Sequence, residues 1–286
     1  MKKLSIITIN RNNAEGLLKT IESVVSQTFD NYEYIIIDGA STDSSVNTIK
    51  QYADKVTYWV SEPVKGIYNA MNKGILQAKG EYCLFLNSGD YLYSNDVLYK
   101  AFIENNCDED IVTGDMLKLY PDQTSRLDKG QAYARKQEGR ELTLFDMYWG
   151  TLNHSSSFIK RKLFDEYGLY DENYKIVSDW IFFLKTIGLN NAKVKYIDLI
   201  ISSFDMSGVS NVNMNLRNKE RSEVIESNFP SNFLKDYEYF HQLLQQIQSL
   251  QQLRQIEKKY NYLFEYSFTY FIARFVNKVI RLFHKN

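Results

Sequence analysis

The stretch that decides the fold class is Tyr34-Ile35-Ile36-Ile37-Asp38-Gly39-Ala40-Ser41-Thr42-Asp43. It begins with a short, continuous apolar run, which is typical of a strand buried on both faces of a sheet. Glycine and hydroxyl residues follow this run, and they favour a turn that leads into a helix. The chain contains three further short apolar runs: Leu4–Ile9, Val56–Val60 and Tyr82–Leu86.

The segments between these runs have helical periodicity. The clearest example has apolar residues at Leu17, Leu18, Ile21, Val24 and Val25. Buried strands that alternate with helices indicate parallel pairing through right-handed crossovers. The sequence therefore predicts an α/β domain with a Rossmann-like, mainly parallel central sheet flanked by helices.

Polar residues follow several of the predicted strands. In open sheets of this kind, ligands bind beyond the carboxyl ends of the strands, so one rim is expected to hold Asn10–Asn13, Asp38–Asp43 and Asn87–Asp90. A carboxylate such as Asp38 can accept hydrogen bonds from a ribose or a base edge. Helix capping by Ser41 or Asp43 explains part of the same segment.

The run Asn87-Ser88-Gly89-Asp90 follows the last of these apolar strands. Hard oxygen ligands at a strand end suit Mg²⁺ or Mn²⁺ that bridges a diphosphate. An ordinary Asn-Ser-Gly-Asp turn is the alternative explanation of the run.

Composition and missing motifs exclude several classes of function. The net charge of −1 gives the chain no overall attraction to nucleic acid. Cys83 and Cys107 lie in unrelated contexts, which fits a reducing cytoplasm better than a disulfide framework. The apolar run Leu4–Ile9 is too short for a signal peptide or a membrane span, so the catalytic part is expected in the cytosol.

The loop Asn10–Asn13 stands where a glycine-rich dinucleotide motif would follow the first strand. The sequence also lacks a P-loop, a histidine-based zinc site and a G-x-S-x-G elbow. Dinucleotide, P-loop and serine-nucleophile chemistry therefore have no motif to support them.

The motifs, taken in order, resemble family 2 of the inverting glycosyltransferases, which has the GT-A fold and includes enzymes of bacterial surface-polysaccharide biosynthesis. The resemblance covers about residues 4–210. Its motifs are Ser5-Ile6-Ile7-Thr8-Ile9-Asn10, Asp38-Gly39-Ala40-Ser41-Thr42-Asp43, Gly66-Ile67-Tyr68-Asn69-Ala70-Met71-Asn72-Lys73-Gly74, Asn87-Ser88-Gly89-Asp90, His154-Ser155-Ser156-Ser157-Phe158 and Ser178-Asp179-Trp180.

The resemblance implies a nucleotide-sugar site in the first part of the chain. Thr8 and Asn10 would line the base pocket, Asp38 would hold the base or ribose, and Lys73 would lie near the nucleotide. Asn87 and Ser88 would contact the nucleotide sugar.

Asp90 would bind the metal, Mg²⁺ or Mn²⁺, as the remaining carboxylate of the family's acidic motif. Asn87 and Gly89 stand where that motif usually has aspartates. The resemblance thus implies a divalent cation, while the residues at 87 and 89 depart from the family pattern.

Asp179 matches the family's general base, although Ser178 replaces the glutamate that usually precedes it. A base is needed because the acceptor hydroxyl must lose a proton as it attacks the anomeric carbon. A charge at a helix N-terminus is the structural alternative for Asp179. His154 would contact the acceptor or the diphosphate, and a purely structural hydrogen-bonding role is equally consistent with a single histidine.

Residues 1–210 are expected to form the catalytic domain, with a nucleotide-sugar half at about 1–110 and an acceptor half at about 111–210. Residues 211–286 would form a helical extension. Leucine or isoleucine recurs in its Gln-rich stretch, which predicts a homo-oligomer through residues 235–260. A basic amphipathic pattern over 262–286 favours either a membrane surface or packing against protein.

Together with these patterns, the resemblance implies a cytoplasmic enzyme, peripheral on the inner face of the plasma membrane, that moves a sugar from a UDP- or GDP-linked donor to a hydroxyl of a glycan or lipid-linked acceptor. Asp38, Asp90 and Asp179 are expected to meet around that sugar. A sugar-1-phosphate nucleotidyltransferase is one alternative. A silent nucleotide-sugar or glycan-binding subunit is the other, and it is motivated by the altered acidic motif.

Overall fold

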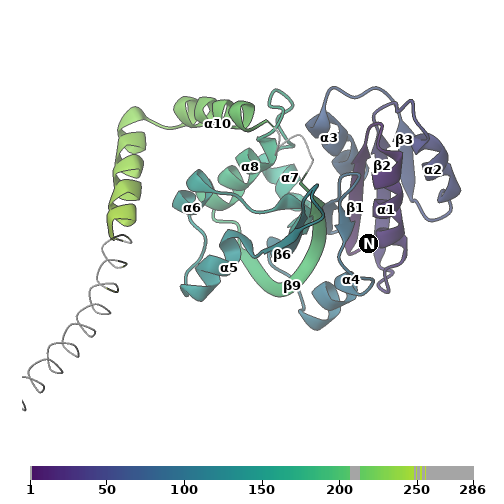
Figure 1. The fold of residues 1–286 in the computed structure, drawn as a ribbon, viewed down its shortest axis with the longest axis horizontal. Coiled ribbons are helices and arrows are strands. Elements are labelled where there is room, and N and C mark those ends of the chain that lie inside the picture. Colours follow the sequence, from purple (N-terminus) through teal and green to yellow (C-terminus); the bar gives the residue numbers. More distant parts are fainter. Residues whose placement is uncertain (1, 207–212, 248, 250–251, 253–254, 256–286) are drawn as a thin grey trace, which may run out of the picture. The chain divides into compact units, whose positions relative to one another are not determined.

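The computed structural model describes residues 2–206 and 213–247, together with 249, 252 and 255. The chain divides into two compact units, Met1–Ile225 and Glu226–Asn286. The first unit contains a mixed sheet of nine strands flanked by helices (Figure 1). The predicted division of residues 1–210 into two functional halves stays a prediction.

Parallel strands form the part of the sheet nearest the N-terminus. They are β1 (Leu4–Asn10), β2 (Tyr32–Asp38), β3 (Tyr58–Ser61) and β4 (Tyr82–Phe85). Their order is β3-β2-β1-β4, and every adjacent pair is parallel. The parallel pairing expected from the apolar runs is confirmed here.

Antiparallel pairing enters the sheet beyond β4. The remaining strands are β5 (Tyr91–Leu92), β6 (Ile111–Leu119), β7 (Ser125–Asp128), β8 (Ser157–Lys160) and β9 (Val194–Asp205). Strand β8 is antiparallel to both β4 and β6, whereas β9 is parallel to β6 and antiparallel to β5. Strand β8 therefore runs opposite to its two neighbours, whereas β6 and β9 run in the same direction as β4.

Helices α1 (Ala14–Val25), α2 (Ser45–Gln51) and α3 (Ile67–Gln77) connect and flank the parallel strands (Figure 1). The side chain of Asn13 caps α1 by accepting a hydrogen bond from the backbone N–H of Gly16 at 3.1 Å. Leu17, Ile21 and Val24 are fully buried on the core-facing side of α1.

The remaining helices of the first unit are mostly short. They are α4 (Val97–Tyr99), α5 (Gly130–Gln137), α6 (Leu144–Trp149), α7 (Lys162–Tyr167) and α8 (Ser178–Phe183). Helix α8 continues from Leu184 to Leu189 as a π-helix. A single 3-10 turn, His154–Ser156, leads into β8.

Helix α10 (Met214–Asn228) is anchored to the first unit by a buried carboxylate. The two oxygens of Glu220 accept hydrogen bonds from the backbone N–H groups of Lys175 at 2.9 Å and Ile176 at 3.0 Å. Val224 is buried one turn further along. These contacts place the start of α10 beside the loop that precedes α8.

In the second unit, residues 231–247 are helical. Exposed apolar side chains on this helix are Tyr239, Phe240, Leu244 and Ile247. The oligomerisation predicted for 235–260 stays a prediction, and the membrane-surface segment 262–286 lies outside the described residues. Within the described part of the chain, no helix is long and apolar enough to cross a membrane.

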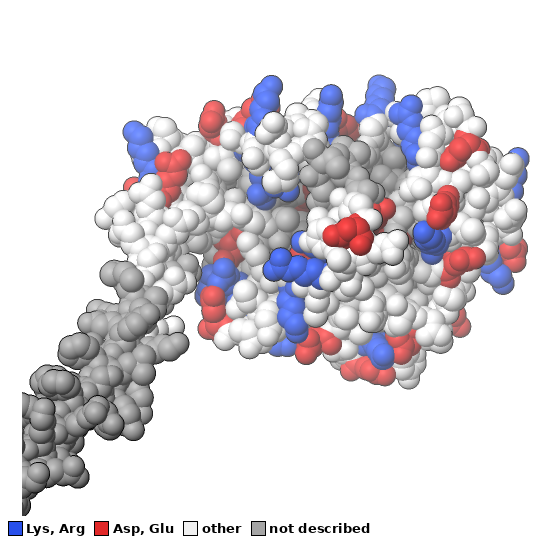
Figure 2. Space-filling model, viewed as in Figure 1, with Lys and Arg blue, Asp and Glu red and all other residues white. Residues whose placement is uncertain are grey.

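Charges of both signs are interspersed over the face of the first unit that Figure 2 shows. This distribution agrees with the net charge of −1 of the whole chain. Long-range steering of a polyanion needs a block of one sign, and the described residues on this face present none.

Replacement of Glu220 by alanine is expected to lower the free energy of unfolding by about 2 kcal/mol, because two backbone donors lose their charged acceptor in a buried place. Urea unfolding measures the loss. Glu223→Ala is the matched control, because Glu223 makes only an exposed ion pair with Lys219 at 3.7 Å. Equal losses for the two variants would contradict the anchoring role of Glu220.

Candidate active site

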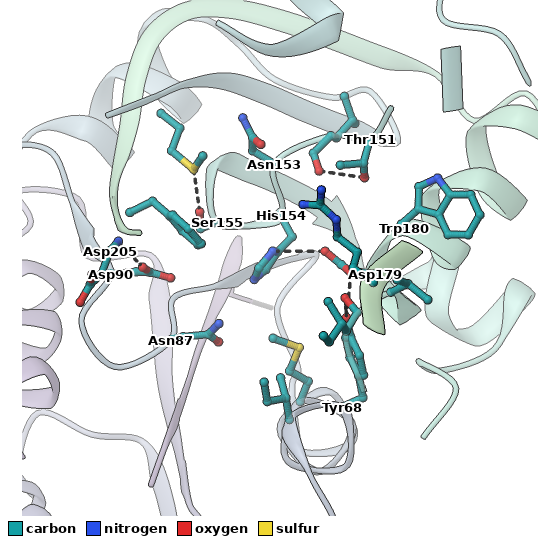
Figure 3. A pocket seen from close by; sticks show the side chains of 18 of the residues that line it. Tyr68, Asn87, Asp90, Thr151, Asn153, His154, Ser155, Asp179, Trp180 and Asp205 are labelled. Carbon is teal, nitrogen blue, oxygen red and sulfur yellow. Dashed lines mark hydrogen bonds and ion pairs between the residues drawn. The ribbon is translucent and has the colours of Figure 1, made fainter. Parts of the chain in front are cut away.

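A cavity of about 560 Å³ opens at the loop-bearing edge of the sheet. Five residues singled out from the sequence line it: Asn87, Ser88, Asp90, His154 and Asp179. They come from three separate segments, namely the loop after β4, the 3-10 turn before β8 and the first turn of α8. Figure 3 shows Asp90 and Asp179 on opposite sides of His154.

The loop Asn87–Asp90 owes its shape to Gly89. Gly89 has a φ of +107°, a conformation that L side chains rarely adopt. Its N–H donates to the hydroxyl of Thr20 at 3.0 Å, and that hydroxyl donates to the backbone carbonyl of Asp90 at 2.7 Å. The backbone conformation at position 89 therefore favours glycine over the aspartate that the family's acidic motif usually has there.

Asp205, at the end of β9, brings a carboxylate to the same place. A side chain built on Gly89 would begin 3.4 Å from Asp205 Oδ2. The N–H of Asp205 donates to Asp90 Oδ1 at 3.1 Å, and Asp205 also lines the cavity. Inspection of the sequence missed this residue, although a carboxylate at a strand end was the signal that identified Asp38.

Two oxygens of the loop are buried without a hydrogen-bond partner in the described part of the chain: Asn87 Oδ1 and Asp90 Oδ2. Burial raises the pKa of Asp90 to about 7, although the backbone hydrogen bond from Asp205 opposes this shift. Such orphaned oxygens are unfavourable unless a donor or a cation satisfies them.

These oxygens fit a hard divalent cation. Mg²⁺ is usually held by one or two carboxylates, while water and substrate phosphates complete its shell. Among the described residues, no group of three or more His, Cys, Asp or Glu forms a complete protein cage for a metal. The fit is therefore to a cation that arrives with a phosphate-bearing ligand.

Asp179 is held in place from two sides. The hydroxyl of Tyr68, on α3, donates to Asp179 Oδ1 at 2.8 Å, and His154 Nδ1 lies 3.5 Å from Asp179 Oδ2. Burial alone would raise the pKa of Asp179, but the hydrogen bonds and the charge of His154 outweigh it and hold the pKa below its usual value. Asp179 is therefore a carboxylate at neutral pH.

His154 lies between Asp90 and Asp179 (Figure 3). Burial lowers its pKa, but the hydrogen bond and charge of Asp179, with a further contribution from Asp90, raise the pKa above its usual value. Its Nε2 is buried and has no partner within the described part of the chain. That nitrogen is available to a ligand in the cavity.

Two predicted nucleotide-site residues are fully covered. Thr8 Oγ1 lies 3.1 Å from the hydroxyl of Tyr34. Asp38 accepts from Asn10 Nδ2 at 2.7 Å, from Ser61 Oγ at 2.6 Å, and from both the N–H and the hydroxyl of Ser41. Asp38 is the last residue of β2. Its hydrogen bonds join it to the last residues of β1 and β3, Asn10 and Ser61, and to Ser41 in the loop after β2.

Lys73 Nζ pairs with Glu62 Oε1 at 2.7 Å, next to the loop before α3. Neither Lys73 nor the group Thr8, Asn10 and Asp38 is among the described residues that line the 560 Å³ cavity. Of the three carboxylates expected to meet, Asp90 and Asp179 share this cavity and Asp38 does not line it. The nucleotide roles of these four residues stay predictions.

Two arginines of the cavity were missed, because the chain after 210 was assigned to an appendage. Arg217 and Arg221 of α10 line the cavity, as do Lys175 and Trp180. The guanidinium of Arg221 lies 4.4 Å from the centre of the Trp180 ring, and the indole N–H of Trp180 donates to the carbonyl of Met147 at 2.6 Å. An i, i+4 pair of arginines was the available signal.

The loop-bearing edge of this α/β sheet holds an ionised carboxylate and oxygens suited to a metal-bound phosphate. This combination is typical of an enzyme that transfers a group. The chain belongs to glycosyl transferase family 2, whose profile matches residues 5–168. It is a glycosyltransferase, as the order of its motifs predicted. This membership sets aside the nucleotidyltransferase alternative.

Curated relatives share most of this chain. A PGL/p-HBAD biosynthesis glycosyltransferase of Mycobacterium bovis is 28% identical over 213 residues, which cover 72% of this chain and 78% of that protein. An uncharacterized glycosyltransferase of Mycobacterium tuberculosis is 31% identical over 207 residues, which cover 72% of this chain and 76% of that protein.

Solved structures confirm the predicted GT-A fold. S. aureus TarS 1–349 in complex with UDP matches with a TM-score of 0.57 at 21% identity, over 71% of this chain and 60% of that one. The mannosyltransferase PcManGT from Pyrobaculum calidifontis, in complex with GDP-Man and Mn²⁺, matches with a TM-score of 0.54 at 16% identity, over 71% and 56% of the two chains.

The His154–Asp179 pair is expected to stabilise the fold in a defined pH window. Because the pKa of His154 is raised, its contribution is present below about pH 6.5 and is lost as pH rises through the folded-state pKa. Because the pKa of Asp179 is lowered, its contribution is present above about pH 3.8 and is lost as pH falls through the folded-state pKa.

A double-mutant cycle with His154→Gln and Asp179→Asn measures this coupling through urea unfolding. We expect a coupling of about 1 kcal/mol near pH 5.5 that declines toward zero in alkaline solution. A coupling that does not change with pH would show that the charged pair is absent.

The variant Asp90→Asn tests how the unpartnered oxygen Asp90 Oδ2 affects the stability of the protein. Since the pKa of Asp90 is raised to about 7, its ionisation lowers stability as pH rises. Without added metal, the variant is expected to be more stable than the wild type above about pH 8, on the order of 2 kcal/mol, and to lose this advantage near pH 4.

Thermal unfolding with Mn²⁺ and a nucleoside diphosphate supplies the second readout. The ligands together should raise the melting temperature of the wild type, because they bind only the folded state. An equal rise for Asp90→Asn would contradict a cation at Asp90.

Proposed function

We propose that this glycosyltransferase moves a sugar from a nucleotide-linked donor to a hydroxyl of a glycan or lipid-linked acceptor, with inversion at the anomeric carbon. The observation that carries the proposal is the placement of Asp179 and the orphaned oxygens of Asn87 and Asp90 in one cavity. An inverting displacement needs a base on one side of the anomeric carbon and a stabilised leaving group on the other.

In the proposed reaction, the acceptor oxygen forms a bond to the anomeric carbon as the bond from that carbon to the diphosphate oxygen breaks. The nucleoside diphosphate leaves with the electron pair, and Asp179 receives the proton of the acceptor hydroxyl. Tyr68 and His154 orient the Asp179 carboxylate for this transfer. No covalent intermediate with the protein is required.

Asn87 and Asp90, together with Asp205, would hold a divalent cation, Mg²⁺ or Mn²⁺, which when bound neutralises charge on the departing diphosphate. His154 lies between this end of the cavity and Asp179 (Figure 3). With Nδ1 turned toward Asp179, its unpartnered Nε2 is proposed to donate to the acceptor or the diphosphate. The altered residues at 87 and 89 do not require a silent subunit.

The proposed donor is a UDP- or GDP-linked sugar. Structures similar to this chain were solved with UDP, with UDP-GlcNAc and with GDP-Man. Thr8, Asn10, Asp38 and Lys73 are proposed to form or support the nucleotide pocket. For Asp38, direct contact with a base or ribose requires the exchange of a hydrogen bond that it makes to Asn10, Ser41 or Ser61.

The proposed acceptor belongs to a cell-surface polysaccharide or glycolipid. Curated relatives named for PGL/p-HBAD biosynthesis support an acceptor of this general kind. The proposed setting is the cytoplasmic face of the plasma membrane, with residues 262–286 at the lipid surface and residues 235–260 joining copies of the chain.

A screen of UDP- and GDP-sugars for binding and slow hydrolysis, with Mn²⁺ or with EDTA, identifies the donor. On the donor that binds, Asp179→Asn is expected to lower the rate about 10²- to 10⁴-fold and to leave donor affinity unchanged, because the base acts only in the chemical step. Asp165→Asn is the matched control, since Asp165 is exposed and pairs only with Arg161.

Unchanged turnover in Asp179→Asn would contradict the assignment of the base. Binding of the donor without any turnover by the wild type, with acceptor glycans present, would favour the silent-subunit alternative instead.

A further inference from the structure

One end of the cavity carries cations that form no ion pair within the described part of the chain. Arg217 and Arg221 are four residues apart on α10, so both lie on one helix face. Arg217 Nε is buried and has no hydrogen-bond partner among the described residues, while Arg221 Nη2 donates to the carbonyl of Gly150 at 2.8 Å. Neither arginine forms an ion pair with any residue of the described ranges, and the same holds for Lys175.

The other cation of the cavity behaves differently. Lys118 also lines it, and its ammonium group pairs with Asp128 Oδ2 at 2.6 Å. Burial and, to a lesser extent, the charge of Arg217 lower the pKa of Arg221 to about 10, although the charge of Asp179 opposes this shift. Two half-buried guanidinium groups side by side are costly without an anion between them. An anion bound between the two arginines would offset this cost.

The charged groups of the cavity have a definite order. The pKa of His154 responds to both Asp179 and Asp90, whereas the pKa of Arg221 responds to Asp179. Figure 3 agrees: Asp90 and Asp205 lie on one side, His154 and Asp179 in the middle, and Trp180 on the other side. Arg221 packs on Trp180, so the arginine end lies across Asp179 from the orphaned oxygens.

This order assigns the two ends of the cavity to different substrates. In an inverting transfer, the acceptor approaches the anomeric carbon from the face opposite the diphosphate. The orphaned oxygens of Asn87 and Asp90 fit the diphosphate with its cation. The acceptor therefore enters at the end that holds Arg217 and Arg221.

We propose that the acceptor carries an anionic group, a phosphate or a carboxylate, and that Arg217 and Arg221 bind it while Asp179 faces the acceptor hydroxyl. This inference rests on the proposed function and adds the chemical class of the acceptor. The planar fork of guanidinium N–H groups matches the oxygens of either anion. The Arg221 guanidinium lies over the ring of Trp180, and this cation–π contact holds it in place.

Three matched probes test the proposal: octyl glucoside, octyl glucoside 6-phosphate and octyl glucuronide. Their binding is measured by calorimetry on the whole chain saturated with UDP or GDP, whichever the donor screen selects. At least one charged probe is expected to bind about tenfold more tightly than the neutral one. The phosphate and glucuronide arms then tell which anion is preferred.

The variants Arg217→Gln and Arg221→Gln should lose this preference and keep their nucleotide affinity. Arg221→Lys retains the charge and should keep part of the preference, which guards against loss through misfolding. Lys118→Gln, which removes the paired cation, should keep it fully.

Equal affinity for the charged and neutral probes, or no binding of either charged probe, would overturn the proposal. So would an arginine variant that loses nucleotide affinity and keeps its preference for charged probes, because the pair would then serve the donor diphosphate. Failure of the proposed function would appear separately, as the absence of nucleotide-sugar binding and turnover.

Discussion

The hydrogen bond from Tyr68 to Asp179 joins the two parts of the chain that the reaction needs. Tyr68 begins α3, beside the parallel strands, whereas Asp179 begins α8, more than a hundred residues later. The same hydroxyl lies 2.6 Å from the backbone carbonyl oxygen of Ile176, so its single proton is shared between the Asp179 carboxylate and the turn that precedes α8. His154, in the turn before β8, holds the other carboxylate oxygen. The position of the Asp179 carboxylate therefore depends on side chains from two other segments of the chain.

The acidic motif in the loop after β4 also depends on a distant segment of the chain. Gly89 adopts a backbone conformation that disfavours a side chain, and β9 delivers Asp205 to the adjacent space. A carboxylate from a distant strand thus lies where the family's motif would place one from the loop itself. Asn87 and Asp90 keep two buried oxygens unsatisfied, an arrangement that is tolerated when a ligand completes it.

Much of the fold could be predicted from the sequence, because buried parallel strands leave continuous apolar runs. Leu4–Asn10 and Tyr32–Asp38 are such strands, and their pairing is parallel as expected. The antiparallel direction of β8 could not be predicted in the same way. Strand direction depends on which partner Ser157–Lys160 meets, and that contact is made with residues far away in the chain.

Prediction from the sequence pointed to Asp90, in the loop after β4, and to Asp179, which lies in the first turn of α8; both line one cavity, and their roles stay predictions. It was less informative for Asp38, because the sequence does not reveal that Asn10, Ser41 and Ser61 surround its carboxylate. Arg217, Arg221 and Asp205 were missed for a different reason. These residues line the cavity because α10 and β9 pack beside it. The local sequence pattern carries little information about such long-range packing.

The central claim is that one sugar diphosphate lies between the Asn87–Asp90 loop and Asp179. A crystal structure with an unreactive nucleotide-sugar analogue and Mn²⁺ measures this directly. The account predicts the diphosphate beside Asn87 and Asp90, with the anomeric carbon between it and Asp179. A diphosphate bound at the arginine end, or an anomeric carbon that faces away from Asp179, would contradict it.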